Sequence, residues 1–189
     1  METVGVIGGG QMGSQIAALA AMAGYETHVY DSDSENLKSK IKFTEDNLLN
    51  LIDKGRYEKS KLDNFKEHLH SSESIDETIN KKSFVIEAVV ERLDIKLEIF
   101  ENISKKLDEN VVLATNSSFI PASEIAKSCE HPSRFINMHF FYPPIRMDLV
   151  EISYPVETNK ETIERTQTLG KEMGRTVITC KKETPGFIV

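Results

Sequence analysis

The chain has 189 residues, of which 39% are hydrophobic and 28% charged, and its net charge at neutral pH is −7. This length suits one well-buried α/β domain, and the acidic balance excludes non-specific nucleic-acid binding. The longest apolar stretch, residues 16–23, is too short to span a bilayer, so no membrane association is expected. Cys129 and Cys180 lie in no CxxC or zinc-binding spacing, which favours free thiols in a reducing cytoplasm.

The first thirty-one residues follow the order of a dinucleotide-binding unit. An apolar strand at residues 4–7 runs into Gly8-x-Gly10-x-x-Gly13, and an alanine-rich helical segment, residues 14–23, follows at once. The first glycine permits a tight turn, the second lets the backbone approach a pyrophosphate, and the third lets helix and strand pack closely. A GxGxxG run alone often only closes a turn, but strand, glycines and helix in this order favour cofactor binding.

An acidic residue ends the second predicted strand, at residues 26–30. Asp31 lies 23 residues beyond Gly8, and an acidic side chain near this spacing binds the ribose hydroxyls of the cofactor. Residues 32–34 are Ser-Asp-Ser, so the 2′-phosphate of NADP would meet negative charge and no arginine. The sequence therefore predicts NAD as the cofactor.

A long helix is predicted next, from a polar N-cap at residues 32–34 to Gly55, with apolar residues at helical spacing. Basic residues cluster at its end: Lys54, Arg56, Lys59 and Lys61. A solvated helix terminus explains them more simply than a contact with a phosphorylated substrate. A short helix over residues 60–70 and a polar connection should follow. His68 and His70 have no evident third ligand, so we predict no metal site.

Strands and helices alternate through the middle of the chain. An apolar strand at residues 83–90 ends at Glu91, and the next helix carries an apolar face formed by Leu93, Leu97, Phe100, Ile103 and Leu107. A strand at residues 111–114 then opens into Asn116, Ser117 and Ser118. This alternation predicts a Rossmann-type, doubly wound α/β fold, with a mostly parallel sheet and helices on both faces. The strand ends should bring the glycine turn, Asp31, Glu91 and residues 116–118 to one rim.

The last third adds a mixed edge to this sheet and carries two candidate catalytic side chains. Alternation places Asn137 and His139 on one face of a strand at residues 135–141, and Glu151 on one face of a strand at residues 149–152. If these strands are neighbours, His139 and Glu151 can face each other. A helix at residues 160–173 and a strand at residues 176–179 should complete the domain.

On spacing alone, a histidine beside three phenylalanines is more often a packed core residue than a catalyst. A dinucleotide fold changes this balance, because alcohol oxidation needs a base for the hydroxyl proton as well as a hydride acceptor. Histidine, with an unperturbed pKa of about 6.5, suits that task, and Glu151 could hold one tautomer of His139. Ser118 could hydrogen-bond the substrate oxygen, although it could equally be a loop serine that caps the next helix.

Several motifs, taken together, resemble the 3-hydroxyacyl-CoA dehydrogenase family. They are Gly8-Gly-Gly-Gln-Met-Gly-Ser-Gln-Ile-Ala17, Ile86-Glu-Ala-Val-Val-Glu-Arg-Leu-Asp-Ile-Lys96, Asn116-Ser-Ser118, Met138-His-Phe-Phe-Tyr-Pro143, Met147-Asp-Leu-Val-Glu151 and Thr184-Pro-Gly-Phe-Ile-Val189. The resemblance covers nearly the whole chain in order. It implies NAD-dependent oxidation of an (S)-3-hydroxyacyl-CoA to the 3-oxoacyl-CoA.

The resemblance also implies roles for individual residues. His139 would be the general acid/base, Glu151 would orient it, and Ser118 would contact the substrate. Lys54 would reach the CoA moiety, which replaces the simpler interpretation of that one lysine. The cofactor-binding set would be Gly8, Gly10, Gln11, Met12, Gly13, Asp31, Glu91, Lys96 and Asn116.

The sequence departs from the family pattern at three places in the expected site. Tyr142 stands where asparagine is usual, Asp148 stands where lysine is usual, and Phe119 follows Asn116-Ser-Ser in place of the common Asn-Thr-Ser-Ser. These departures leave the substrate open, including a non-CoA hydroxy acid such as that of the gulonate dehydrogenases. We expect residues 1–189 to form the NAD-binding domain of a cytoplasmic protein. The helical substrate domain of the family, through which a homodimer would form, has no counterpart here, so a dinucleotide-binding module without useful activity is a further alternative.

Overall fold

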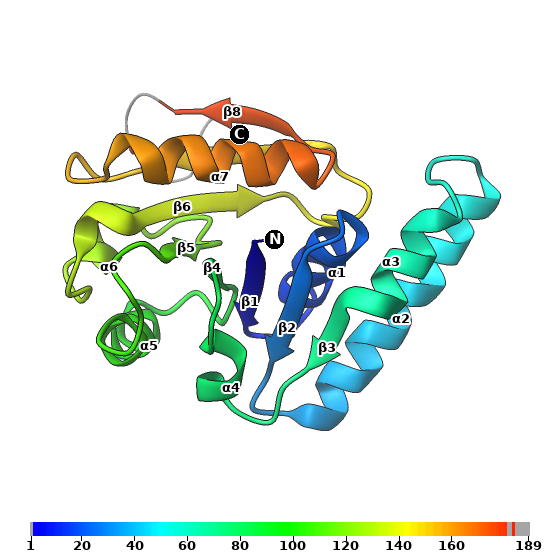
Figure 1. Ribbon diagram of the computed structural model, residues 1–189, viewed down its shortest axis with the longest axis horizontal. Helices are drawn as coiled ribbons and strands as arrows, with labels where there is room; N and C mark the ends of the chain where they lie inside the picture. The colour runs from blue at the N-terminus through cyan, green and yellow to red at the C-terminus, as the bar shows by residue number, and fades with distance from the viewer. Residues whose placement is uncertain (1, 181–182, 184–189) are drawn as a thin grey trace.

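The sheet is the centre of the molecule, and the computed structural model describes residues 2–180 and Glu183 (Figure 1). Its strand order is β3-β2-β1-β4-β5-β6-β7-β8. Strands β1 to β6 run parallel, whereas β7 is antiparallel to β6 and β8 is parallel to β7. The strands are β1 (Thr3–Ile7), β2 (Glu26–Tyr30), β3 (Leu69–Ser71), β4 (Phe84–Glu87), β5 (Val112–Thr115), β6 (Phe135–Phe140), β7 (Leu149–Ser153) and β8 (Thr176–Thr179). The predicted doubly wound sheet with a mixed C-terminal edge is therefore confirmed.

Helices cover both faces of this sheet, as the alternation of strands and helices predicts. They are α1 (Gly13–Met22), α2 (Ser34–Asp53), α3 (Ser60–His68), α4 (Ile75–Ile79), α5 (Leu93–Ser104), α6 (Ala122–Ala126) and α7 (Lys160–Glu172), with a 3₁₀ turn, η1, at Pro132–Arg134. Val4, Val6 and Ile86 pack in one core with α1, α2, α3 and α7. Ile7 and Val85 point to the other face and pack with α4, α5 and α6. Among the described residues, no helix combines the length and apolar character needed to cross a membrane.

The long helix α2 begins and ends where its sequence predicts. The side chain of Asp33 accepts a hydrogen bond from the amide of Asn36, which satisfies a donor at the helix N-terminus. At the other end Gly55 has φ of +72°, a conformation that glycine adopts without strain, and its amide donates to Ile52. These two caps set the beginning and the end of α2.

The segment after α3 differs from the sequence prediction. The helix expected over residues 60–70 ends at His68, and Leu69–Ser71 forms β3, which pairs with β2. A second short helix, α4, follows within the expected polar connection. A three-residue strand shows too little alternation to be detected in sequence, and β2 supplies its ladder partners.

Strand β4 is also shorter than expected, and its end affects the site. The predicted strand of residues 83–90 stops at Glu87, and residues 88–90 leave the sheet. Leu93, expected on the buried face of α5, is 37% exposed, whereas Lys96 is buried. Leu93 begins the helix, outside the main core, whereas the ammonium of Lys96 finds a buried carboxylate partner on β4. The apolar-face prediction was therefore wrong for Leu93, although it holds for Phe100 and Ile103.

Candidate active site

The glycine turn between β1 and α1 has the geometry that its sequence predicts. Gly8 has φ of +95°, and a Cβ atom there would lie 2.7 Å from the carbonyl of Ala88. A Cβ atom at Gly13 would lie 1.7 Å from the carbonyl oxygen of Gly8, so close packing of helix and strand requires glycine. A Cβ atom at Gly10 would meet no atom within 4 Å. The middle glycine thus faces open space, as expected where a pyrophosphate approaches the backbone.

Asp31 lies opposite this turn, directly after β2. Its Oδ2 accepts a hydrogen bond from the amide of Gly9 at 2.8 Å, and its Oδ1 accepts one from the amide of Asp33 at 3.0 Å. The carboxylate lines a cleft of about 660 Å³, together with Gly8, Gly10, Gln11, Met12 and residues 88–90. The first turn of α1 contains no acidic side chain, so the helix N-terminus offers its positive end to an anion. The open glycine, the oriented carboxylate and the helix end together fit a dinucleotide.

His139 and Glu151 form the pair that strand alternation predicts. They lie opposite each other in the antiparallel register of β6 and β7, and His139 Nδ1 is 3.2 Å from Glu151 Oε2. Glu151 is fully buried, whereas the side chain of His139 keeps 13% of its surface exposed. Because a carboxylate only accepts hydrogen bonds, Nδ1 carries the proton of the neutral ring, and Nε2 is then its basic nitrogen.

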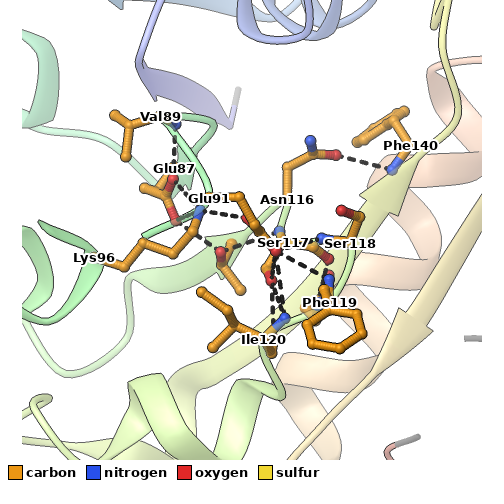
Figure 2. A network of polar contacts seen from close by, with 12 residues as sticks. Glu87, Val89, Glu91, Lys96, Asn116, Ser117, Ser118, Phe119, Ile120 and Phe140 are labelled. Carbon is orange, nitrogen blue, oxygen red and sulfur yellow. Dashed lines mark hydrogen bonds and ion pairs between the residues drawn. The ribbon is translucent and has the colours of Figure 1, made fainter. Parts of the chain in front are cut away.

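Ser118 lies in a tight turn after β5 that is organised by Glu91 (Figure 2). Glu91 Oε1 accepts hydrogen bonds from Ser117 Oγ at 2.5 Å and from the amides of Ser118, Phe119 and Ile120 at 3.0, 2.9 and 3.3 Å. The N-cap of α6 is Pro121, so the alternative interpretation of Ser118 as a helix cap is wrong.

The same hydrogen bonds shift the acidity of Glu91. Burial alone would raise the pKa of this carboxyl group. The hydrogen bond from Ser117, the charge of Lys96 and the backbone amides of Phe119 and Ile120 outweigh burial, and the pKa falls below its ordinary value. Glu91 therefore holds the turn as a charged group.

Two asparagine side chains join the Ser118 turn to the strand that carries His139. Asn116 Oδ1 accepts a hydrogen bond from the amide of Phe140 at 2.9 Å, and Asn137 Nδ2 donates to the carbonyl of Ser117 at 2.9 Å. The amide of Asn116 also donates to the carbonyl of Glu87 at 2.8 Å. The ends of β4, β5 and β6 are thus tied together, which confirms that these predicted strand ends meet at one rim.

A buried ion pair lies beneath this rim, and the sequence indicated only one of its members, Lys96, as a site residue. Glu87 and Lys96 are 0% and 1% exposed, and Lys96 Nζ lies 2.7 and 2.9 Å from the two carboxylate oxygens of Glu87. Lys96 Nζ also lies 3.3 Å from Glu91 Oε2. A lone acid inside an apolar strand, with a lysine nine residues later, was the signal available in the sequence. The expected contact of Lys96 with the cofactor stays a prediction.

Comparison with known proteins then decides the family. Residues 3–184 match the family described as 3-hydroxyacyl-CoA dehydrogenase, NAD binding domain. The chain belongs to this family. The cofactor is therefore NAD, in agreement with Asp31 and the open face of Gly10.

Similar proteins agree with this assignment. The chain is 34% identical to the mitochondrial hydroxyacyl-coenzyme A dehydrogenase of Sus scrofa and 31% identical to a probable 3-hydroxybutyryl-CoA dehydrogenase of Bacillus subtilis, with all of the chain covered in both. It spans 62% and 65% of their lengths. The structure of (S)-3-hydroxybutyryl-CoA dehydrogenase from Ralstonia eutropha superposes with a TM-score of 0.92 at 32% identity, over 100% of this chain and 66% of that one. The pig protein's name places it in mitochondria, and the cytoplasmic location expected here stays a prediction.

The departures from the family pattern have structural counterparts. Asp148, in place of a lysine, lies 2.7 Å from the guanidinium of Arg56 at the tip of the α2–α3 hairpin. Lys54, two residues before Arg56, is exposed at the same tip, and its contact with CoA stays a prediction. Tyr142 is half exposed and, with Gln15 and Phe43 among others, lines a cavity of about 180 Å³. Residues 184–189, which carry the last motif of the resemblance, lie outside the described residues.

The two histidines first considered as a metal pair, His68 and His70, have a neighbouring carboxylate that the sequence did not indicate. Glu26 lies within 3.5 Å of His68 and 2.8 Å of His70, and within 3.7 Å of His28 on its own strand. A third potential ligand, Glu26, therefore lies beside the pair, and the expectation that none is near was wrong. Even so, no group of three or more such side chains in residues 2–180 is arranged to hold a metal ion.

Proposed function

We propose that this chain supplies the cofactor-binding and acid/base parts of an NAD-dependent dehydrogenase that oxidises (S)-3-hydroxyacyl-CoA to 3-oxoacyl-CoA. The observation that carries the proposal is the His139–Glu151 pair across β6 and β7. Hydrogen bonds of Asn116 and Asn137 tie β6, the strand of His139, to the Ser118 turn. That turn is held by Glu91, next to the residues that line the dinucleotide cleft. A base, a hydrogen-bond donor and a cofactor cleft thus share one rim.

Each side chain has a defined task in the proposed reaction. Bound NAD supplies the acceptor for the hydride that leaves the hydroxyl-bearing carbon. Nε2 of His139 takes the hydroxyl proton, and Glu151 stabilises the resulting imidazolium through Nδ1. The hydroxyl of Ser118 donates a hydrogen bond to the substrate oxygen as it becomes a carbonyl. The alcohol loses one hydride and one proton, so the reaction balances without a metal ion.

The substrate class is supported by the relatives, which are named hydroxyacyl-CoA and 3-hydroxybutyryl-CoA dehydrogenases. The Asp148–Arg56 pair adds a separate observation, because it removes positive charge at the hairpin tip beside Lys54. Neutralisation of Arg56 would weaken the attraction of this tip for a CoA phosphate. A non-CoA hydroxy acid is therefore the second candidate substrate.

The test is NADH formation by the protein expressed from its complete reading frame. We expect NADH from (S)-3-hydroxybutyryl-CoA and little from free 3-hydroxybutyrate. His139→Gln should lower kcat by about 10²–10⁴-fold, which is the usual contribution of a general acid/base. His131→Gln is the matched control, because His131 is exposed and outside the site, and its kcat should equal that of the wild type.

The other outcomes separate the alternatives. Turnover of free hydroxy acids in preference to thioesters would replace the CoA substrate with the second candidate. NAD binding by calorimetry, without turnover of either class, would identify a dinucleotide-binding module. A kcat for His139→Gln within a few fold of wild type would remove His139 from its proposed role.

A further inference from the structure

The buried carboxylate of Glu87 makes four contacts that lead in two directions. Its Oε1 accepts hydrogen bonds from Lys96 Nζ and from the amide of Val89, both at 2.7 Å. Its Oε2 accepts them from Lys96 Nζ at 2.9 Å and from Thr115 Oγ1 at 2.7 Å. Val89 lines the dinucleotide cleft, and Thr115 is the last residue of β5, just before the Ser118 turn. Glu87 thus contacts Val89 of the dinucleotide cleft (Figure 2) and also the last residue of the strand that leads to the Ser118 turn.

Glu87 determines how the hydroxyl group of Thr115 is oriented. A hydroxyl group has one proton, and Thr115 donates it to Glu87. Its oxygen is then turned to accept a hydrogen bond from the amide of Ser117, at 3.2 Å. A carboxylate can only accept, so Glu87 enforces this orientation. An amide in its place could donate to Thr115 and reverse the hydroxyl.

A second contact reaches the same turn through Lys96. Glu87 holds the ammonium of Lys96 within 3.3 Å of Glu91 Oε2, while Glu91 Oε1 accepts the amides of Ser118 and Phe119. Thr115 and Glu87 are fully buried, so water is excluded from the Thr115 link. Both links end on the turn that presents Ser118, and both begin at Glu87.

We propose that Glu87 is a positioning residue for Ser118, acting through Thr115 and Lys96. The proposal rests on the proposed function, because it concerns the placement of the donor to the substrate oxygen. A positioning role differs from a general structural role in its dependence on Ser118. Substitution of Glu87 or Thr115 should lower turnover when Ser118 is present, but not when its hydroxyl group has been removed.

A double-mutant cycle in the protein from the complete reading frame separates these two roles. Thr115→Val keeps the shape of the side chain but removes the hydroxyl, and we expect kcat to fall about tenfold. Thr115→Ser keeps the hydroxyl and should restore kcat to within about twofold of wild type. In a Ser118→Ala background, Thr115→Val should change kcat by less than about twofold, because the positioned group is already gone.

Glu87→Gln supplies a second, independent arm of the cycle. It should lower kcat in the wild-type background and have little effect in the Ser118→Ala background. If this variant does not fold, the Thr115 variants still test the proposal. Thr166→Val is the matched control: Thr166 is also fully buried and donates to a backbone carbonyl of its own helix, α7, so its kcat should equal the wild-type value.

The failures of the two proposals are distinguishable. Equal losses of kcat for Thr115→Val in both backgrounds, in an active wild-type enzyme, would overturn the positioning role and leave the proposed function intact. Failure of Thr115→Ser to restore turnover would also overturn it. A wild-type protein that oxidises no hydroxyacyl-CoA would instead refute the proposed function on which the positioning role rests.

Discussion

The rim of the sheet has two parts, the glycine turn and the region around Ser118 and His139, and different chemical groups form them. Around the glycine turn, the backbone and the missing side chains of Gly8, Gly10 and Gly13 define the site, and Asp31 completes it within 31 residues. Around Ser118 and His139, the site is made of charged and polar side chains from β4, α5, β6 and β7 and from the segments that follow β4 and β5. In the proposed function, the first part would recognise the cofactor by shape and backbone donors, and the second would hold the reacting groups with buried charge.

This difference determines how each part should fail. A substitution in the glycine turn adds atoms where backbone or ligand must lie, so its effect is steric. A substitution in the second part leaves a charge or a donor without its partner in a dry environment, and such groups are costly.

The largest effect is expected for Lys96→Met. It leaves Glu87 as an unpaired buried carboxylate, and breaking such a pair typically costs about 3–5 kcal/mol. Urea unfolding of the purified variant measures the loss. Lys54→Met is the control, because Lys54 is exposed and its replacement should change stability by less than about 0.5 kcal/mol. Equal stabilities for the two variants would show that the buried pair is not needed for folding.

A steric effect should separate two glycines of the turn. Gly13→Ala places a Cβ atom on the carbonyl of Gly8, and overpacking of this kind costs about 1–3 kcal/mol. Gly10→Ala meets only open space, so its thermal stability should equal that of the wild type while its affinity for NAD falls. Unfolding curves and calorimetric titration with NAD distinguish the two variants. Full NAD affinity in Gly10→Ala would mean that the cofactor does not approach this backbone.

Asp31→Asn tests the charge at the same turn. The side chain keeps its size but loses its negative charge, which in the proposed cofactor site would accept hydrogen bonds from the ribose hydroxyls and repel a 2′-phosphate. We expect the Kd for NAD to rise about tenfold, equivalent to about 1.4 kcal/mol. The Kd for NADP should rise less or fall. Competition titrations with both cofactors measure the ratio, and an unchanged ratio would remove Asp31 from cofactor selection.

The smallest effect concerns the pH dependence of stability through Glu91. The folded state lowers the pKa of this carboxyl below its ordinary value of 4.5, so the unfolded chain binds the proton more readily. The stabilisation is therefore complete above pH 4.5 and is lost as the pH falls through the folded pKa. On acidification the wild type should lose more stability than Glu91→Gln. Parallel curves of unfolding free energy against pH for the two proteins would contradict this account.

The same contrast explains what the sequence could predict. The glycine turn and Asp31 lie close together in the chain, so their spacing alone indicated both their geometry and NAD. The His139–Glu151 pair was also predictable, because alternation in two strands fixed the faces on which the side chains lie. Glu87 was missed because its partners Lys96 and Thr115 come from other elements, and only the folded structure brings them to it. Strand β3 was missed because its pairing with β2 outweighs any local preference.

The most direct test of the central claim, that one rim joins a dinucleotide site to an acid/base pair, is the behaviour of Glu151→Gln. This variant should bind NAD with the wild-type Kd, because Glu151 lies outside the cleft lined by the glycine turn. Its kcat should fall at least about 100-fold, because the amide no longer stabilises the imidazolium of His139. Calorimetry and steady-state NADH formation on the same preparation give both values. A kcat within a few fold of wild type, with NAD binding intact, would contradict the account.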